Sequence, residues 1–337
     1  MRIREAIAFS TCALFACSHH QGAATDNDGG TSQPDATPLD AAYCGGQHLD
    51  LSYVPPNLGI VLDRSCSMTK ALAGTTTTKW QAAVAALRDV LTTYATDVRW
   101  GLTMFPDTAG SACTQGTIPF PIGVHSAHQI EARLQAALGS GDADYPDDPC
   151  VTPIDTGVEQ AATDPALADT DRKSYLLLVT DGAQAGCSAG GSAAGAEDAV
   201  AQLFTAGIAT YVVGFGSEVK ASELDTLAVA GGVPNTGSNA YYQADTAAEL
   251  DAVFQQIASQ IVSCTYQVSE APPDLAETYV IFGGNTLVPY DPSNTSGWDY
   301  DPAMMTLTLY GAYCSELKTH AVSSFDVLFG CPSPPIF

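Results

Sequence analysis

Hydrophobic positions in the middle of the chain alternate between short apolar runs and segments with a helical period. Residues 58–62 and 174–180 are nearly continuous apolar runs, as expected of strands buried on both faces of a sheet. Residues 79–94 and 246–262 repeat apolar side chains every three or four positions, which predicts amphipathic helices. The alternation predicts an α/β fold: a doubly wound, mostly parallel sheet with helices on both faces.

The same pattern predicts the remaining elements. Further strands are expected at 99–105, 117–124, 208–215 and 240–243, and further helices at 127–138, 153–162, 193–206 and 222–230. Pro119 and Pro121 lie in the strand 117–124, so we expect that strand at an edge of the sheet.

After Cys264 the pattern changes to short runs separated by Pro, Gly, Asn and Asp. We expect five strands there, at 265–269, 278–282, 286–289, 304–309 and 323–329. This predicts a small C-terminal all-β appendage. Its tyrosines and Trp298 indicate core and hairpin packing, with an aromatic binding face as the alternative.

The N-terminal residues have the pattern of an export signal. A basic start is followed by an apolar segment at 6–16, which is too short to span a bilayer. Residues 14–17, LFAC, resemble a bacterial lipobox, in which Cys17 is acylated and becomes the mature N-terminus. Phe15 and Glu5 depart from that pattern, so ordinary signal-peptide cleavage is the alternative. No later stretch is apolar enough over a sufficient length to be a transmembrane helix.

These patterns predict four parts. They are a signal segment with lipobox at 1–17, a flexible tether at 18–43, the α/β domain at 44–264 and the β-rich domain at 265–337. We expect an exported protein. It is either a lipoprotein anchored at the outer membrane, cell surface or periplasm, or a secreted protein.

The chain is strongly acidic. It has 12 Lys plus Arg against 37 Asp plus Glu, a formal net charge of −25. This argues against nucleic acid and anionic membrane surfaces as partners. The acidity is compatible with cation binding, although solubility alone explains it.

The most specific motif follows the first buried strand. Asp63, Ser65 and Ser67 place a carboxylate and two hydroxyls at alternate positions directly after 58–62. Hard oxygen ligands suit Mg²⁺, which often keeps several waters. The alternative is a solvated Ser-rich turn that caps the next helix.

Two later segments extend this motif. Thr152 lies in a loop that opens a helical stretch, and Asp181 directly follows the apolar run 174–180. Over residues 55–262 the chain resembles the von Willebrand factor A domain family, whose metal-ion-dependent adhesion site uses D-x-S-x-S, a distant Thr and an Asp after a further strand. The resemblance implies that Asp63, Ser65, Ser67, Thr152 and Asp181 bind Mg²⁺, or Mn²⁺ or Ca²⁺.

The resemblance also implies a function. A protein partner would place an acidic side chain, Asp or Glu, in a coordination position that the chain leaves open. The membrane would be contacted only through the N-terminal lipid anchor. One alternative is an envelope scaffold stabilised by metal and disulfides, without an exchangeable ligand. A remote alternative is an enzyme with Cys66 or Asp63 as nucleophile, but no His lies near either loop in the sequence.

Eight cysteines follow Cys17, an even number that export allows to form four disulfides. Placed on the fold that the resemblance implies, they suggest four pairs: Cys44–Cys264, Cys66–Cys187, Cys113–Cys150 and Cys314–Cys331. A free, nucleophilic Cys66 is the alternative.

Two other clusters contain residue types that bind cations. His125 and His128 are spaced to contact one metal, but a third ligand is not visible, so a surface helix start is favoured. The acidic run of Asp142, Asp144, Asp147 and Asp148 does not match a calcium loop. We interpret it as a solvated loop and a candidate rim of the site at Thr152.

Overall fold

The computed structural model of the protein describes residues 47–107, 116, 118–123, 126–185, 193–319, 321–322 and 324–330. The chain divides into two compact units, Met1–Asp40 and Ala41–Phe337, and all described residues belong to the second. The predicted signal segment and tether therefore lie outside the described residues. Among the helices that are described, none is both long and apolar enough to cross a membrane.

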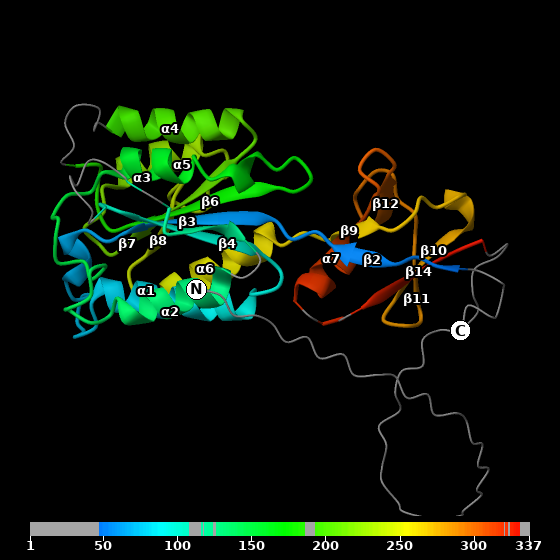
Figure 1. The fold of residues 1–337 in the computed structure, drawn as a ribbon, viewed down its shortest axis with the longest axis horizontal. Coiled ribbons are helices and arrows are strands. Elements are labelled where there is room, and N and C mark those ends of the chain that lie inside the picture. The colour runs from blue at the N-terminus through cyan, green and yellow to red at the C-terminus, as the bar shows by residue number, and fades with distance from the viewer. Residues whose placement is uncertain are drawn as a thin grey trace, which may run out of the picture. The chain divides into compact units, whose positions relative to one another are not determined.

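A six-stranded sheet with the order β5-β4-β3-β6-β7-β8 forms the larger domain (Figure 1). Its strands are β3 (Asn57–Asp63), β4 (Arg99–Phe105), β5 (Phe120–Gly123), β6 (Ser174–Thr180), β7 (Ala209–Phe215) and β8 (Tyr242–Ala244). All neighbours pair in parallel except β5, which pairs antiparallel with β4 at the sheet edge. The predicted fold class is confirmed.

Helices cover both faces of this sheet, as Figure 1 shows. They are α1 (Lys79–Thr93), α2 (Ser126–Ala136), α3 (Ile154–Ala161), α4 (Ala193–Thr205), α5 (Ala221–Ala230) and α6 (Ala247–Ile261). Leu58, Ile60 and Leu62 of β3 pack in one core cluster with α1, α2 and α6, whereas Val61 packs in the other with α3, α4 and α5. The continuous apolar run of β3 is therefore explained by its burial on both faces.

Two small antiparallel sheets form the second region, with the orders β1-β14-β10-β11 and β12-β13-β9-β2. The strands are β1 (Gln47–His48), β2 (Leu51–Tyr53), β9 (Thr265–Val268), β10 (Thr278–Phe282), β11 (Thr286–Val288), β12 (Gly297–Asp301), β13 (Thr306–Tyr310) and β14 (Phe325–Phe329). Helix α7 (Gly311–Lys318) follows β13 directly. Trp298 and Tyr300 are buried in the core of this region, which supports the packing interpretation for these two aromatic residues.

The predicted start of the α/β domain at residue 44 needs correction. β1 pairs with β14 and β2 pairs with β9, so both strands belong to the antiparallel sheets. Strands of two and three residues are too short to show a period in the sequence. The larger domain begins at Asn57 and lies in sequence between strands of the smaller region.

A disulfide joins Cys264 to Cys314, so the predicted pairs Cys44–Cys264 and Cys314–Cys331 are wrong. The physical reason is α7, which the sequence pattern did not reveal. The backbone nitrogen of Leu309, in β13, donates to the Cys264 carbonyl (3.0 Å), so the end of β13 lies beside Cys264. α7 follows β13 directly, and its first turns therefore bring Cys314 close to Cys264.

Candidate metal centre

The first loop places a buried carboxylate at the carboxyl end of the central strand. β3 ends at Asp63, and the short 3₁₀ helix η2 (Cys66–Thr69) follows two residues later. Asp63 Oδ1 accepts a hydrogen bond from the backbone nitrogen of Ser65 (2.8 Å), and Oδ2 accepts one from the Thr180 hydroxyl (2.6 Å). These two bonds hold a fully buried carboxylate in a single orientation.

Hydroxyl groups connect this loop to the loop that follows β6. The Oγ atoms of Ser65 and Ser67 are 2.9 Å apart, and Ser67 Oγ donates to Oδ1 of Asp181 (2.6 Å). Asp181 comes directly after β6, which lies beside β3 in the sheet. Polar groups at the carboxyl ends of neighbouring parallel strands meet at one edge, which is where such sheets bind ligands.

The second loop brings Thr152 to the same edge. Thr152 and Ala185 exchange two backbone hydrogen bonds of 3.0 Å each, which ties the second loop to the segment after Asp181. A recess of about 270 Å³ opens at this point. It is lined by Ser65, Cys66, Ser67, Lys70, Cys150 and Thr152. The five residues predicted as ligands from three separate segments are therefore neighbours in the structure.

Lys79 is a member of this site that sequence reasoning missed. Its Nζ lies 2.8 Å from Oδ2 of Asp181, and both side chains are buried, with 5% and 0% exposed. Lys79 is the first residue of α1, and a cation is unfavourable at a helix N-terminus. That unfavourable position is the sequence signal that could have prompted a search for an acidic partner.

The environment of Asp63 favours a cation. Burial and the nearby charge of Asp181 raise the pKa of Asp63 from 3.8 to about 6, although hydrogen bonds from Thr180 and Ser65 oppose this rise. A carboxylate destabilised in this way gains from a bound positive charge. In the part of the chain that the structure describes, no group of three or more His, Cys, Asp or Glu side chains converges on one point. The donor set is instead mainly hydroxyl, and such hard oxygen ligands suit small divalent cations.

Cys66 is disulfide-bonded to Cys150. The predicted pairs Cys66–Cys187 and Cys113–Cys150 are therefore wrong, and Cys66 is not a free thiol in this structure. The prediction paired Cys150 with Cys113 because these two remained once Cys66 had been placed with Cys187. Cys150 lies two residues before Thr152, and both residues line the recess. Cys44, Cys113, Cys187 and Cys331 lie outside the described residues.

Two arginine side chains, Arg133 and Arg64, bind the acidic run before Thr152. Arg133 forms ion pairs with Asp142 and, at 2.6 Å, with Asp144. The Arg133 hydrogen bond holds the pKa of Asp142 below its usual value. Arg64, which is buried, donates to the backbone oxygen of Ala143 in the same run (3.3 Å). These contacts favour a packed loop beside the site over a calcium site.

The histidine pair gains no support from the structure. The His128 side chain is 81% exposed and its Nδ1 lies 3.7 Å from Glu131, as expected of a helix surface. His125 lies outside the described residues.

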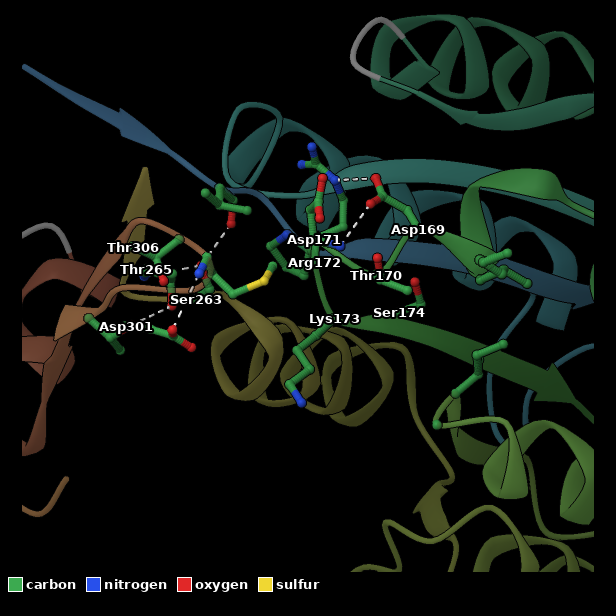
Figure 2. A pocket seen from close by; sticks show the side chains of 18 of the residues that line it. Asp169, Thr170, Asp171, Arg172, Lys173, Ser174, Ser263, Thr265, Asp301 and Thr306 are labelled. Carbon is green, nitrogen blue, oxygen red and sulfur yellow. Dashed lines mark hydrogen bonds and ion pairs between the residues drawn. The ribbon is translucent and has the colours of Figure 1, made fainter. Parts of the chain in front are cut away.

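A larger recess, of about 460 Å³, lies at the opposite end of β6, and Figure 2 shows it from close by. Residues 169–174 line one side, and Thr265, Asp301 and Thr306 line the other. Arg172 donates to Asp169 (2.7 Å) and to the backbone oxygen of Pro55 (3.0 Å), so this cation is already paired. The recess shares no residue with the predicted metal ligands.

A mostly parallel sheet with a hydroxyl-rich loop cluster at its carboxyl edge defines an α/β domain suited to binding a cation. Residues 57–256 match the family model of the von Willebrand factor type A domain, which is more than half of the chain. The chain belongs to this family. No curated protein matches the sequence.

Solved structures with a similar fold include proximal thread matrix protein 1 from the mussel byssus. It is 16% identical with a TM-score of 0.46, over 64% of this chain and 50% of that protein. This chain thus spans half the length of that protein. Another structure of the mussel protein is described as having a zinc-occupied MIDAS motif. The pilus adhesin SpaC of Lactobacillus rhamnosus GG is 14% identical with a TM-score of 0.46, over 81% of this chain and 38% of that chain. The PilB minor pilin of Streptococcus sanguinis is 16% identical with a TM-score of 0.44, over 62% of each chain.

Proposed function

We propose that this protein binds a divalent cation through Asp63, Ser65, Ser67, Thr152 and Asp181, and that the bound ion attaches it to an acidic side chain of a partner protein. Membership of the family and the convergence of five oxygen-bearing side chains support the proposal. When bound, the ion supplies a positive charge at the surface recess. Mg²⁺ or Mn²⁺ fits the small hydroxyl-rich set, and Ca²⁺ is the further candidate.

The observation that carries the proposal is the charge balance of the site. Lys79 neutralises Asp181 through a buried ion pair, whereas both oxygens of Asp63 accept hydrogen bonds from neutral donors. The chain therefore offsets about one of the two charges of the ion. A site built to hold a cation permanently would use more carboxylates and close the shell. This site favours an anionic group from outside.

The surroundings of the recess favour the same kind of partner. Lys70 lines it, with an exposed ammonium group that lies 3.2 Å from Glu218. An incoming carboxylate would meet this cation close to the hydroxyls. The formal charge of −25 repels an acidic partner at long range, so added salt should raise the association rate more than it changes the final contact.

Capture of a partner tests the proposal. Purified protein is immobilised and exposed to cell-envelope extract with Mg²⁺, then washed with chelator. Release by chelator is expected, as is weaker capture by Thr152→Ala than by Thr92→Ala, an exposed control on α1. Substitution of Asp and Glu in the captured protein should then abolish binding.

Two outcomes contradict the proposal. Capture that persists undiminished in chelator would show that the partner uses another surface, such as the antiparallel region. Tight metal binding that changes stability but no partner contact would favour the structural scaffold.

The location of the protein follows in part from its disulfides. Two disulfides among the described residues indicate an oxidising compartment, and so an exported protein. The basic start, the apolar segment and the LFAC sequence support a lipid anchor on Cys17 as the finer proposal. Labelling with a radioactive fatty acid should mark the wild type and not Cys17→Ser. Equal labelling of both would contradict the anchor.

A further inference from the structure

We infer that the Cys66–Cys150 disulfide is a clamp that holds the metal-binding loops together, and that its reduction lowers the affinity for the ion. The inference rests on the proposed metal site and adds a form of redox control to it. Cys66 lies between Ser65 and Ser67, and Cys150 lies two residues before Thr152. The covalent bond thus sits within two residues of three proposed ligands.

The three loops of the site are tied to one another in pairs. Ser67 links the first loop to the third through Asp181, and Thr152 links the second to the third through its backbone bonds with Ala185. The disulfide links the first loop to the second across 84 residues of sequence. It therefore completes a closed set of connections around the recess.

Reduction would remove the link between the first and second loops. The second loop would keep its backbone pair with Ala185, but Thr152 would lose its covalent connection to the loop that carries Ser65 and Ser67. Ligands that are held in place before the ion arrives bind it more tightly, because less conformational entropy is lost on binding. The affinity for the ion should therefore fall while the sheet beneath remains folded.

A reductant can reach this disulfide more easily than the other one. Cys150 is exposed, Cys66 is partly exposed and both line the open recess. In the other disulfide, Cys264 is 4% exposed, and Cys314 is partly buried and packs against the core of the antiparallel region. Thiol–disulfide exchange requires access to a sulfur atom, so Cys66–Cys150 should be reduced first.

The reaction is an exchange with a dithiol reductant. One thiolate of the reductant attacks the Cys150 sulfur, which forms a mixed disulfide and releases Cys66 as a thiolate that takes up a proton. The second thiol of the reductant then displaces Cys150, which also becomes a thiol. Two electrons and two protons pass to the protein, and the reductant is oxidised to its own disulfide.

Calorimetric titration with Mg²⁺ alone tests the inference. Four samples are compared: oxidised wild type, wild type reduced with dithiothreitol, Cys66→Ser/Cys150→Ser, and Cys264→Ser/Cys314→Ser as the matched control. We expect the reduced protein and the first double variant to bind Mg²⁺ about tenfold more weakly. The control should stay within about twofold of the oxidised wild type.

The outcomes separate this inference from the proposed function. If oxidised wild type binds Mg²⁺ and Cys66→Ser/Cys150→Ser binds it equally well, the clamp is refuted and the metal site stands. If oxidised wild type does not bind Mg²⁺, both fail. Circular dichroism checks that each variant is folded. Should the first double variant not fold, wild type in which mass mapping shows Cys66–Cys150 reduced and Cys264–Cys314 intact gives the same comparison.

Discussion

The carboxyl edge of the parallel sheet and the two antiparallel sheets bury different kinds of side chain. At the carboxyl edge Asp63, Arg64, Lys79 and Asp181 are all buried, whereas in the described part of the antiparallel sheets the buried polar residues are two threonines, Thr278 and Thr306. Burial of charged groups costs free energy and adds little net stability even when the charges are paired. The difference supports the proposal that the carboxyl edge binds an ion, whereas the antiparallel region contributes mainly stability.

The largest expected effect on stability comes from the antiparallel region. Trp298 is 1% exposed at the centre of its core, so Trp298→Ala should lower the free energy of unfolding by about 4 kcal/mol. The affinity for Mg²⁺ should stay within about twofold of the wild type, because the site is made by other elements. Denaturant unfolding and calorimetry measure the two quantities. A loss of Mg²⁺ binding in the folded variant would show that the regions are coupled.

Lys79→Met should affect stability and binding in opposite directions. Removal of the ammonium leaves the buried Asp181 without its ion-pair partner, so the metal-free protein should lose about 3 kcal/mol of stability. The uncompensated carboxylate should then bind Mg²⁺ about tenfold more tightly. Thermal unfolding with and without Mg²⁺ measures both effects. Lower affinity for Mg²⁺ in the folded variant would contradict the charge balance on which the proposed function depends.

Sequence patterns located the proposed ligands better than the contacts that organise them. Asp63 was found because a buried strand gives a continuous apolar run and its end is marked by D-x-S-x-S. Lys79 was missed because its partner lies 102 residues away, and no local pattern reports such a pair. Cys66 was given the wrong partner because the path of the segment before Thr152 depends on tertiary packing.

The same distinction holds for the fold. Strands β3, β4, β6 and β7 could be predicted because each has seven residues and is almost entirely buried. In the antiparallel region β2 has three residues, and its place depends on β9, which lies beyond the whole α/β domain. Alternation is visible in β12, where Trp298 and Tyr300 are buried and Asp299 is less so, but one short strand is a weak signal.

A smaller effect is expected from pH. The pKa of Asp63 is about 6 in the folded protein against an ordinary value of 3.8, so between these values the folded state binds more protons than the unfolded state. Stability of the metal-free protein should therefore fall as pH rises from 4 to 6, by up to about 1.4 kcal/mol per pH unit from this group. Mg²⁺ affinity should change in the other direction and weaken below pH 6, since the proton competes with the ion.

Comparison with Asp63→Asn isolates this group from the other carboxylates. The difference in unfolding free energy between wild type and Asp63→Asn, measured at several pH values without metal, should vary over the window from 4 to 6 and level off below it. A difference that is independent of pH would show that Asp63 titrates normally.

Mg²⁺ titration of Asp63→Ala is the most direct test of the metal centre. Asp89→Ala, which removes an exposed carboxylate from α1, is the matched control. Wild type and Asp89→Ala should each bind one Mg²⁺ in the calorimeter. Asp63→Ala should remain folded, because it loses a buried carboxylate whose raised pKa opposes folding at neutral pH, and should show no heat of binding. Equal Mg²⁺ affinity in Asp63→Ala and wild type would contradict the assignment of this sheet edge as a metal site.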